Sequence, residues 1–201
     1  MSKQPRDFSR YDSVWIEAET YLRARKNDVH IPLSFACVQR LLDEYPEADR
    51  DIATLALMLH DIGWYSIDME DIIEKGFRGP NMLQSDVRYL HEAEGVRIGT
   101  EILRKTGWSE EVIAAVCEII DGHDTRPDPL HLNDRIARDA DKLWRYSVTG
   151  VAVACDWFKM TPRAYADRLE EQKLTLETEA GRRFAAEMLA DTRDKLMLHL
   201  I

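Results

Sequence analysis

The chain has 201 residues, of which 45% are hydrophobic and 32% are charged, and this composition is typical of a soluble globular protein. Its 27 Lys and Arg against 37 Asp and Glu give a net charge of −10. That balance argues against a nucleic-acid partner, which usually requires a basic face, although a local group of cations or a metal can hold a small phosphorylated ligand. No apolar run approaches the roughly 20 residues of a membrane helix, and the polar N-terminus lacks a signal-peptide core. We therefore expect a cytoplasmic protein without a membrane partner.

Apolar residues recur at helical spacing along most of the chain, and no segment alternates like a strand. In chain order, the pattern predicts helices over about 9–26, 38–45, 52–59, 86–105, 110–121, 132–147, 150–159, from 162 onward and over 176–199, with a loop at 76–81. The helix at 52–59 is apolar nearly all round and should be central. We predict an all-α protein that forms one domain over residues 1–201.

Two of these helices begin with recognisable capping residues. Ser109 precedes Glu110 and Glu111, whose negative charges suit the N-terminal end of a helix. Thr161 followed by Pro162 combines a capping hydroxyl with a proline at the first helical position. Both patterns predict a helix start.

His60 and Asp61 directly follow the central apolar helix, in the stretch ALMLHDIGW. A carboxylate at the C-terminal end of a buried helix is disfavoured by the helix dipole and by burial. A positive group should therefore compensate Asp61, and a bound cation would do so well.

Three other polar residues continue the apolar faces of their own helices: His91, His123 and Asp141. Gly95, one turn after His91, leaves room beside that histidine. Together with His60 and Asp61, these residues point inward from four helices, which core packing alone does not explain. Imidazole and carboxylate ligands suit Mn, Fe, Co, Ni, Zn or Mg.

The ordered set of histidines and aspartates resembles the HD superfamily of metal-dependent phosphohydrolases, and in particular small bacterial single-domain members. His30 in DVHIPLSFACVQRLL, the His60–Asp61 pair in LHDIG, and Asp141 in DADKL match the positions of the family's ligands. The resemblance covers about residues 25–160. It implies a single HD-type helical bundle around a metal site, completed by helices over 161–201. Pro32 departs from the pattern and suggests that His30 lies at a helix start.

The resemblance also implies a role for each residue. His30, His60, Asp61 and Asp141 would bind one divalent metal, and Asp61 would also orient or deprotonate the attacking water. For His91 and His123 two roles are open. They would either contact the phosphate and assist proton transfer, or complete a second metal site bridged by Asp61. One or two ions per chain are therefore expected.

Three cations near these positions are candidates to hold the substrate: Lys142, Arg145 and Arg88. Each could instead form an ion pair, and Asp141 is the obvious partner of Arg145.

We predict a metal-dependent phosphohydrolase that acts on a nucleotide or another small phosphorylated metabolite, since similar small HD proteins include nucleoside triphosphate pyrophosphohydrolases and 5′-nucleotidases. The alternative is a diiron oxygenase of the HD fold, similar to inositol oxygenase, which shares the ligand order. A non-catalytic ligand-sensing domain fits least, because all ligand positions are filled. A homo-oligomer is left open.

Overall fold

The computed structural model describes residues 6–72, 75 and 85–199, and these residues form helices and turns without a strand. The all-α prediction is thereby confirmed, while the loop predicted at 76–81 lies outside the described residues. The chain divides into two compact units. The first comprises residues 1–28 and 58–127, and the second comprises residues 29–57 and 128–201. The single-domain assignment stays a prediction.

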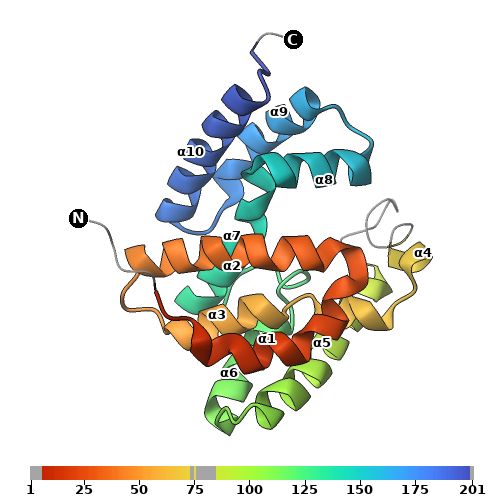
Figure 1. The fold of residues 1–201 in the computed structure, drawn as a ribbon, viewed down its shortest axis with the longest axis vertical. Helices are drawn as coiled ribbons and strands as arrows, with labels where there is room; N and C mark the ends of the chain where they lie inside the picture. Colours follow the sequence, from red (N-terminus) through yellow and green to blue (C-terminus); the bar gives the residue numbers. More distant parts are fainter. Residues whose placement is uncertain (1–5, 73–74, 76–84, 200–201) are drawn as a thin grey trace. The chain divides into compact units, whose positions relative to one another are not determined.

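The first unit is built around two long helices that lie side by side, α5 and α6, with α1 packed against α5 (Figure 1). Buried isoleucines such as Ile98 and Ile102 of α5, and Ile113 of α6, form its apolar interior. Its helical elements are η1 (Ser9–Tyr11), α1 (Asp12–Ala18), η2 (Glu19–Lys26), η3 (Ile62–Ser66), α4 (Met69–Asp71), α5 (Asp86–Lys105) and α6 (Glu110–Ile120).

The helix predicted over 9–26 is present as three short helical elements, but it is broken at its last three residues. Ala24 has an extended ψ of 142°, and Arg25 and Lys26 have positive φ values of 53° and 62°. Residues other than glycine seldom adopt positive φ, and such strain often marks a functional site. Here the turn brings the guanidinium of Arg25 to the carboxylate of Asp61, with Nη1 and Oδ2 3.2 Å apart.

The second unit packs its helices around a larger apolar core. Leu41 of α2, Leu143 of α7 and Leu189 of α10 are at most 1% exposed within it. Its helical elements are α2 (Asn27–Glu44), α3 (Arg50–Leu59), α7 (Leu132–Leu143), η6 (Trp144–Tyr146), α8 (Val148–Phe158), α9 (Pro162–Gln172), η7 (Lys173–Thr175) and α10 (Glu179–Lys195). The first residues of α2 and the last residues of α3 belong to the first unit. Residues 53–59 of α3 are buried throughout, as its all-round apolar pattern predicted.

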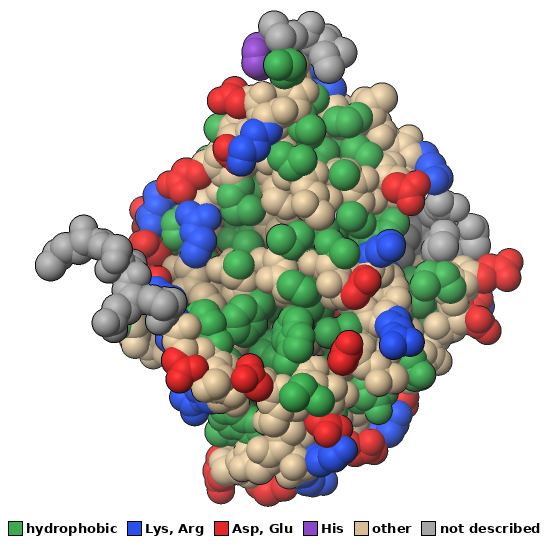
Figure 2. All heavy atoms as spheres, in the orientation of Figure 1, with side chains coloured by type: hydrophobic (Ala, Val, Ile, Leu, Met, Phe, Trp, Pro, Cys, Tyr) green, Lys and Arg blue, Asp and Glu red, His purple; other side chains and the backbone are tan. Residues whose placement is uncertain are grey.

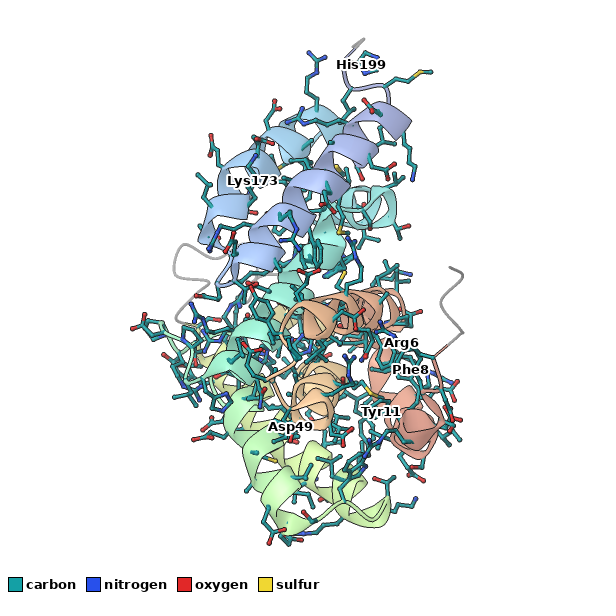
Figure 3. The ribbon with its side chains drawn as sticks, turned by 90° about the vertical axis from the view of Figure 1, so that its left-hand side faces the viewer. Arg6, Phe8, Tyr11, Asp49, Lys173 and His199 are labelled. Atoms are coloured by element: carbon teal, nitrogen blue, oxygen red, sulfur yellow. The ribbon has the colours of Figure 1, made fainter. Side chains whose placement is uncertain are left out.

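Side-chain caps begin several of these helices. The hydroxyls of Ser109 and Thr161 accept the backbone N–H of Val112 and Ala164, which confirms both predicted starts. Asp49, at the start of α3 (Figure 3), likewise accepts two backbone N–H groups in the first turn of that helix. These caps satisfy donors that a helix start leaves without an intrahelical partner.

The surface shows a mixture of charges. On the face drawn in Figure 2, acidic and basic side chains are interspersed with apolar ones. Among the described residues, no helix is both long and apolar enough to cross a membrane.

Candidate metal centre

Asp61 is the centre of a polar group inside the first unit. It follows the last turn of α3 and is 2% exposed. Its Oδ1 accepts the indole N–H of Trp64 at 2.8 Å, and its Oδ2 faces the guanidinium of Arg25. The side chain of Asn27 donates to its backbone carbonyl at 3.1 Å. The positive compensation expected for this carboxylate is therefore supplied in part by Arg25.

Two buried histidines face the same carboxylate oxygen. His91, in the second turn of α5, and His123, just after α6, have their Nε2 atoms 3.3 Å apart. Asp61 Oδ1 lies 3.8 Å from the Nε2 of His91 and 3.6 Å from that of His123. His60, next to Asp61, stacks edge-on against His123 with ring centroids 4.9 Å apart. Three imidazoles and a carboxylate thus converge within one unit.

The hydrogen bonds and packing of each ring fix its orientation. The Nδ1 of His123 lies 2.9 Å from the carbonyl oxygen of Ile120. A carbonyl only accepts hydrogen bonds, so Nδ1 carries a proton and Nε2 is the atom presented to Asp61 and His91. The ring of His91 stacks on Trp64, with centroids 4.0 Å apart and planes 12° apart. Its Nδ1 is buried without a hydrogen-bond partner among the described residues.

These three donor atoms fit a metal ion. Asp61, His91 and His123 each offer one ligand atom, and the atoms lie within 4.8 Å of one another. Nitrogen or oxygen ligands about 2.1 Å from one ion are separated by roughly 3.0–3.4 Å in tetrahedral or octahedral geometry. The separations of 3.3–3.8 Å therefore require only a small contraction around an ion. The set is suited to a borderline divalent cation.

His91 and His123 have pKa values that are shifted in opposite directions. Burial, and then the neighbouring charge of His123, lower the pKa of His91 from 6.5 to about 3. Burial also opposes a charge on His123, but contact with Asp61 and the negative charges of Asp124 and Asp61 outweigh it and raise its pKa to about 9. Without a metal at neutral pH, His91 is therefore neutral and His123 is protonated.

Arg88 is engaged by an aspartate in this unit. Its Nη1 lies 2.6 Å from Oδ2 of Asp124, and that same oxygen is 3.8 Å from the Nε2 of His91. Burial alone would raise the pKa of Asp124, but the positive charges of His123 and Arg88 outweigh it and lower the pKa. Asp124 thus adds a second carboxylate beside the histidines, and Arg88 has a role that requires no substrate.

Glu92 holds the turn that carries His123. It is 2% exposed, and its Oε1 accepts the backbone N–H groups of Asp124 and Thr125, both at 2.9 Å. Its Oε2 accepts the hydroxyl of Thr125 at 2.6 Å. A buried carboxylate with three donors is well satisfied. Glu92 therefore connects α5, which carries His91, to the residues that follow α6.

A glycine allows the backbone around Asp61 to approach α5. A Cβ added to Gly63 would lie 1.9 Å from the carbonyl oxygen of His91 and 2.5 Å from the backbone nitrogen of Gly95. Only glycine fits such a backbone contact. Gly63 therefore sets the distance between η3, which follows Asp61, and the helix of His91.

The second unit brings two other sequence-predicted residues together. His30, in the first turn of α2 and fully buried, lies with its Nε2 2.8 Å from Oδ1 of Asp141. Its ring stacks on Trp144, with centroids 4.9 Å apart. Pro32 lies inside α2, and His30 is near the start of that helix, as its spacing suggested. Arg145 Nη2 is 3.6 Å from the other oxygen of Asp141.

The two aspartates of DADKL have different partners. Asp139 is fully buried, and its carboxylate accepts the backbone N–H groups of Glu177 and Thr178 and the hydroxyl of Thr178. These bonds fasten α7 to the start of α10. Burial outweighs them and raises the pKa of Asp139. Asp141, in contrast, faces His30, and its assignment as a metal ligand stays a prediction from the sequence.

The predicted site residues thus fall into two groups in the structure. His60, Asp61, His91 and His123 converge in the first unit, and His30 and Asp141 pair in the second. One ligand set that combines both groups stays a prediction from the sequence.

Sequence reasoning missed four residues that surround these groups: Arg25, Trp64, Glu92 and Asp124. Only Asp124 had a visible signal, because GHD at 122–124 repeats the His–Asp pair of LHDIG. The contacts of the other three depend on distant parts of the chain.

An all-helical chain with a buried group of histidines and aspartates defines a candidate metalloprotein. Comparison with protein families identifies the class of protein: the HD domain matches residues 32–145, which is more than half of the chain. The chain therefore belongs to the HD-domain family. Comparison with curated proteins and with solved structures gave no match.

Proposed function

We propose that this protein is a metal-dependent phosphohydrolase that cleaves a phosphate ester or anhydride of a nucleotide or another small phosphorylated metabolite. The observation that carries the proposal is the convergence of Asp61, His91 and His123 in a chain of the HD-domain family, whose members are typically such hydrolases. The ligand set of His30, His60, Asp61 and Asp141 is taken from the family resemblance.

A divalent metal, when bound, would lower the pKa of a water molecule and polarise a phosphoryl oxygen. The protein's own groups would do the rest. The Oδ1 atom of Asp61 accepts a hydrogen bond from Trp64 and also lies 3.8 Å from the Nε2 of His91 and 3.6 Å from the Nε2 of His123. The pKa of about 9 of His123 holds for the metal-free protein, so at neutral pH His123 can donate a proton to a phosphate oxygen or a leaving group only if it does not itself bind the ion. His91, neutral there, is suited to accept a proton or to bind an ion.

Metal content and turnover test this proposal together. Elemental analysis of the purified protein should find a divalent metal, and a panel of nucleotides, phosphomonoesters and phosphodiesters should include a substrate. Asp61→Asn and His123→Gln should each remove most of the turnover. His199→Gln is the matched control, because His199 is exposed beside the C-terminus (Figure 3) and should not affect it. A metal-loaded protein that cleaves none of these compounds would contradict the proposal.

A diiron oxygenase is a second candidate, and one feature of Asp61 favours it. Its Oδ1 faces His91 and His123, whereas its Oδ2 lies 3.6 Å from the Nε2 of His60. A carboxylate whose two oxygens face different imidazoles is suited to bridge two ions, provided that the guanidinium of Arg25, 3.2 Å from Oδ2, moves aside for the second ion. Two irons per chain with oxygen-dependent turnover would support this function, and a single redox-inactive metal would exclude it.

A further inference from the structure

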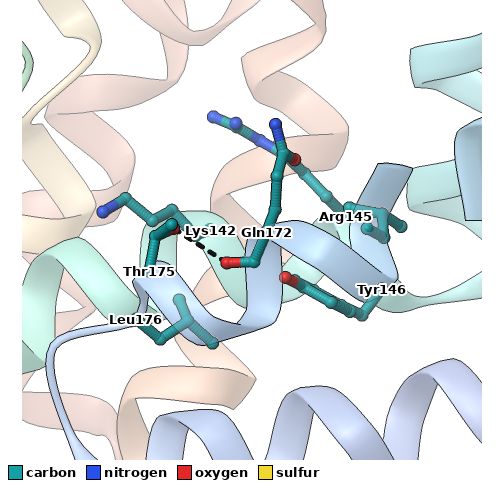
Figure 4. Close-up of a pocket in the computed structure, with 7 residues that line it drawn as sticks. Lys142, Arg145, Tyr146, Gln172, Thr175 and Leu176 are labelled. Atoms are coloured by element: carbon teal, nitrogen blue, oxygen red, sulfur yellow. Dashed lines mark hydrogen bonds between the residues drawn. The ribbon is translucent and has the colours of Figure 1, made fainter. Parts of the chain in front are cut away.

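A small pocket lies entirely within the second unit, between the end of α7 with η6 and the end of α9 with η7 (Figure 4). Its volume is about 200 Å³, and its polar walls come from Lys142, Arg145, Tyr146, Gln172 and Thr175. Pockets that enclose a drug-sized ligand measure roughly 300–1,000 Å³. This pocket is therefore of a size to hold one group of a larger molecule.

The lining chemistry favours an anion. Lys142 forms no hydrogen bond or ion pair within 4 Å with any described residue, so its ammonium group is available. Arg145 adds a second positive charge, partly balanced by its contact with Asp141. Since two cations line so small a volume, an anionic group entering it would gain more than a neutral one.

A buried phenol supplies a further donor. Tyr146 is 2% exposed, and its hydroxyl end points in among the lining residues (Figure 4). Within the described part of the chain, this hydroxyl has no hydrogen-bond partner. Burial raises the pKa of Tyr146, so the group stays protonated and can donate. The hydroxyl is reached from the pocket, so it can donate a hydrogen bond to the oxygen of a ligand that enters there.

We propose that this pocket binds a phosphate-type oxyanion that belongs to the substrate. Arg145 pairs with Asp141, so the pocket begins one helical turn from a predicted metal ligand of the same unit. Gln172 and Thr175 lie beyond residue 145, where the match to the HD domain ends. The C-terminal helices thus contribute to substrate choice. The assignment of the anion to the substrate rests on the proposed phosphohydrolase function, whereas anion binding itself does not.

Calorimetric titration of the full chain with inorganic phosphate tests the pocket, both as purified and after removal of metal by a chelator. We expect saturable binding in both states. Lys142→Gln should weaken phosphate binding about tenfold, because it removes a charge-assisted hydrogen bond. Tyr146→Phe should weaken it about three- to tenfold, because it removes a neutral hydrogen bond. Lys195→Gln and Tyr11→Phe are matched controls that remove an exposed ammonium and a buried phenol hydroxyl outside the pocket, and they should bind like the unchanged chain.

Circular dichroism and thermal melting of each variant show whether weaker binding is due to the missing contact or to unfolding of the protein. Lys142 is only partly buried, so its variant should fold even if the tyrosine variant does not. Absence of phosphate binding, or equal affinity in all four variants, overturns the pocket assignment. If the protein hydrolyses phosphate esters but binds no phosphate here, the pocket fails while the proposed function stands. If phosphate binds through Lys142 but no ester is cleaved, the assignment of the anion to a substrate is overturned.

Discussion

The role of Glu92 can be tested quantitatively, because its three hydrogen bonds are well defined. Its carboxylate is buried and accepts two backbone N–H groups and one hydroxyl from residues 124 and 125. Hydrogen bonds to a charged group contribute about 1.5–3 kcal/mol each, and an unsatisfied buried donor costs a similar amount. Glu92→Ala should therefore lower the free energy of unfolding by about 3–5 kcal/mol, the range found when a buried polar network is broken.

Two milder variants measure how much of this loss in the free energy of unfolding comes from each hydrogen bond. Thr125→Val removes only the hydroxyl bond of 2.6 Å and should cost about 1.5–3 kcal/mol. Glu92→Gln keeps an oxygen for both backbone donors and should cost less than the alanine variant. Urea unfolding of the metal-free chain measures each value, with Glu101→Gln, an exposed carboxylate on the same helix, as the control.

A purely structural Glu92 would change stability alone. Because it holds the turn of His123, its loss should also weaken metal binding by about 10–100-fold, as for other residues that orient metal-binding histidines. Competition with a chelator under conditions where the variant stays folded measures this affinity. Unchanged metal affinity in a folded Glu92→Ala protein, or destabilisation no larger than that of Glu101→Gln, would refute the role assigned to this carboxylate.

Two further predictions concern the same unit. Gly63→Ala should destabilise the protein by about 3 kcal/mol or more, because the added methyl group meets backbone atoms, whereas Gly99→Ala, with contacts of 3.5 Å or longer, should be neutral or slightly stabilising in thermal melts. His91 and His123 together should also stabilise the metal-free protein most near pH 6.5. Between about pH 6.5 and 3, His91 is protonated in the unfolded chain but not in the folded protein, so stability falls as the pH is lowered. Between about pH 6.5 and 9, His123 is protonated in the folded protein but not in the unfolded chain, so stability falls as the pH is raised. Unfolding midpoints measured across pH should show both limbs, and a His123→Gln variant that keeps the alkaline limb would contradict the assignment.

Helical periodicity predicted much of the architecture, because each helix buries a continuous apolar face. The same periodicity placed His91 and His123 on apolar faces, and the structure indeed buries both. It could not predict the turn at Arg25, since no proline or glycine interrupts residues 9–26. The contact between Arg25 and Asp61 joins residues 36 positions apart, a separation that no local pattern reports.

The limits of sequence patterns are clearest for charged residues. For Arg88 the sequence leaves two roles open, substrate contact or an ion pair, since it shows the charge of the residue and not its partner. Its pairing with Asp124 depends on how the end of α6 meets α5, which is set by packing across the unit. Lys142 has no such partner among the described residues and remains a candidate for substrate binding.

The partners of each buried carboxylate separate structural from functional roles. Glu92 and Asp139 each accept three hydrogen bonds from backbone and hydroxyl groups, which saturate them and hold one element against another. Asp61 and Asp141 also have fixed partners, but each in addition faces imidazole nitrogens, which are themselves metal ligands when neutral. A carboxylate satisfied by fixed donors gains little from a cation, whereas one that faces imidazoles gains charge compensation and shared coordination. In DADKL, Asp139 thus fastens α7 to α10, whereas Asp141 faces an imidazole, as expected for the metal ligand that the family resemblance predicts.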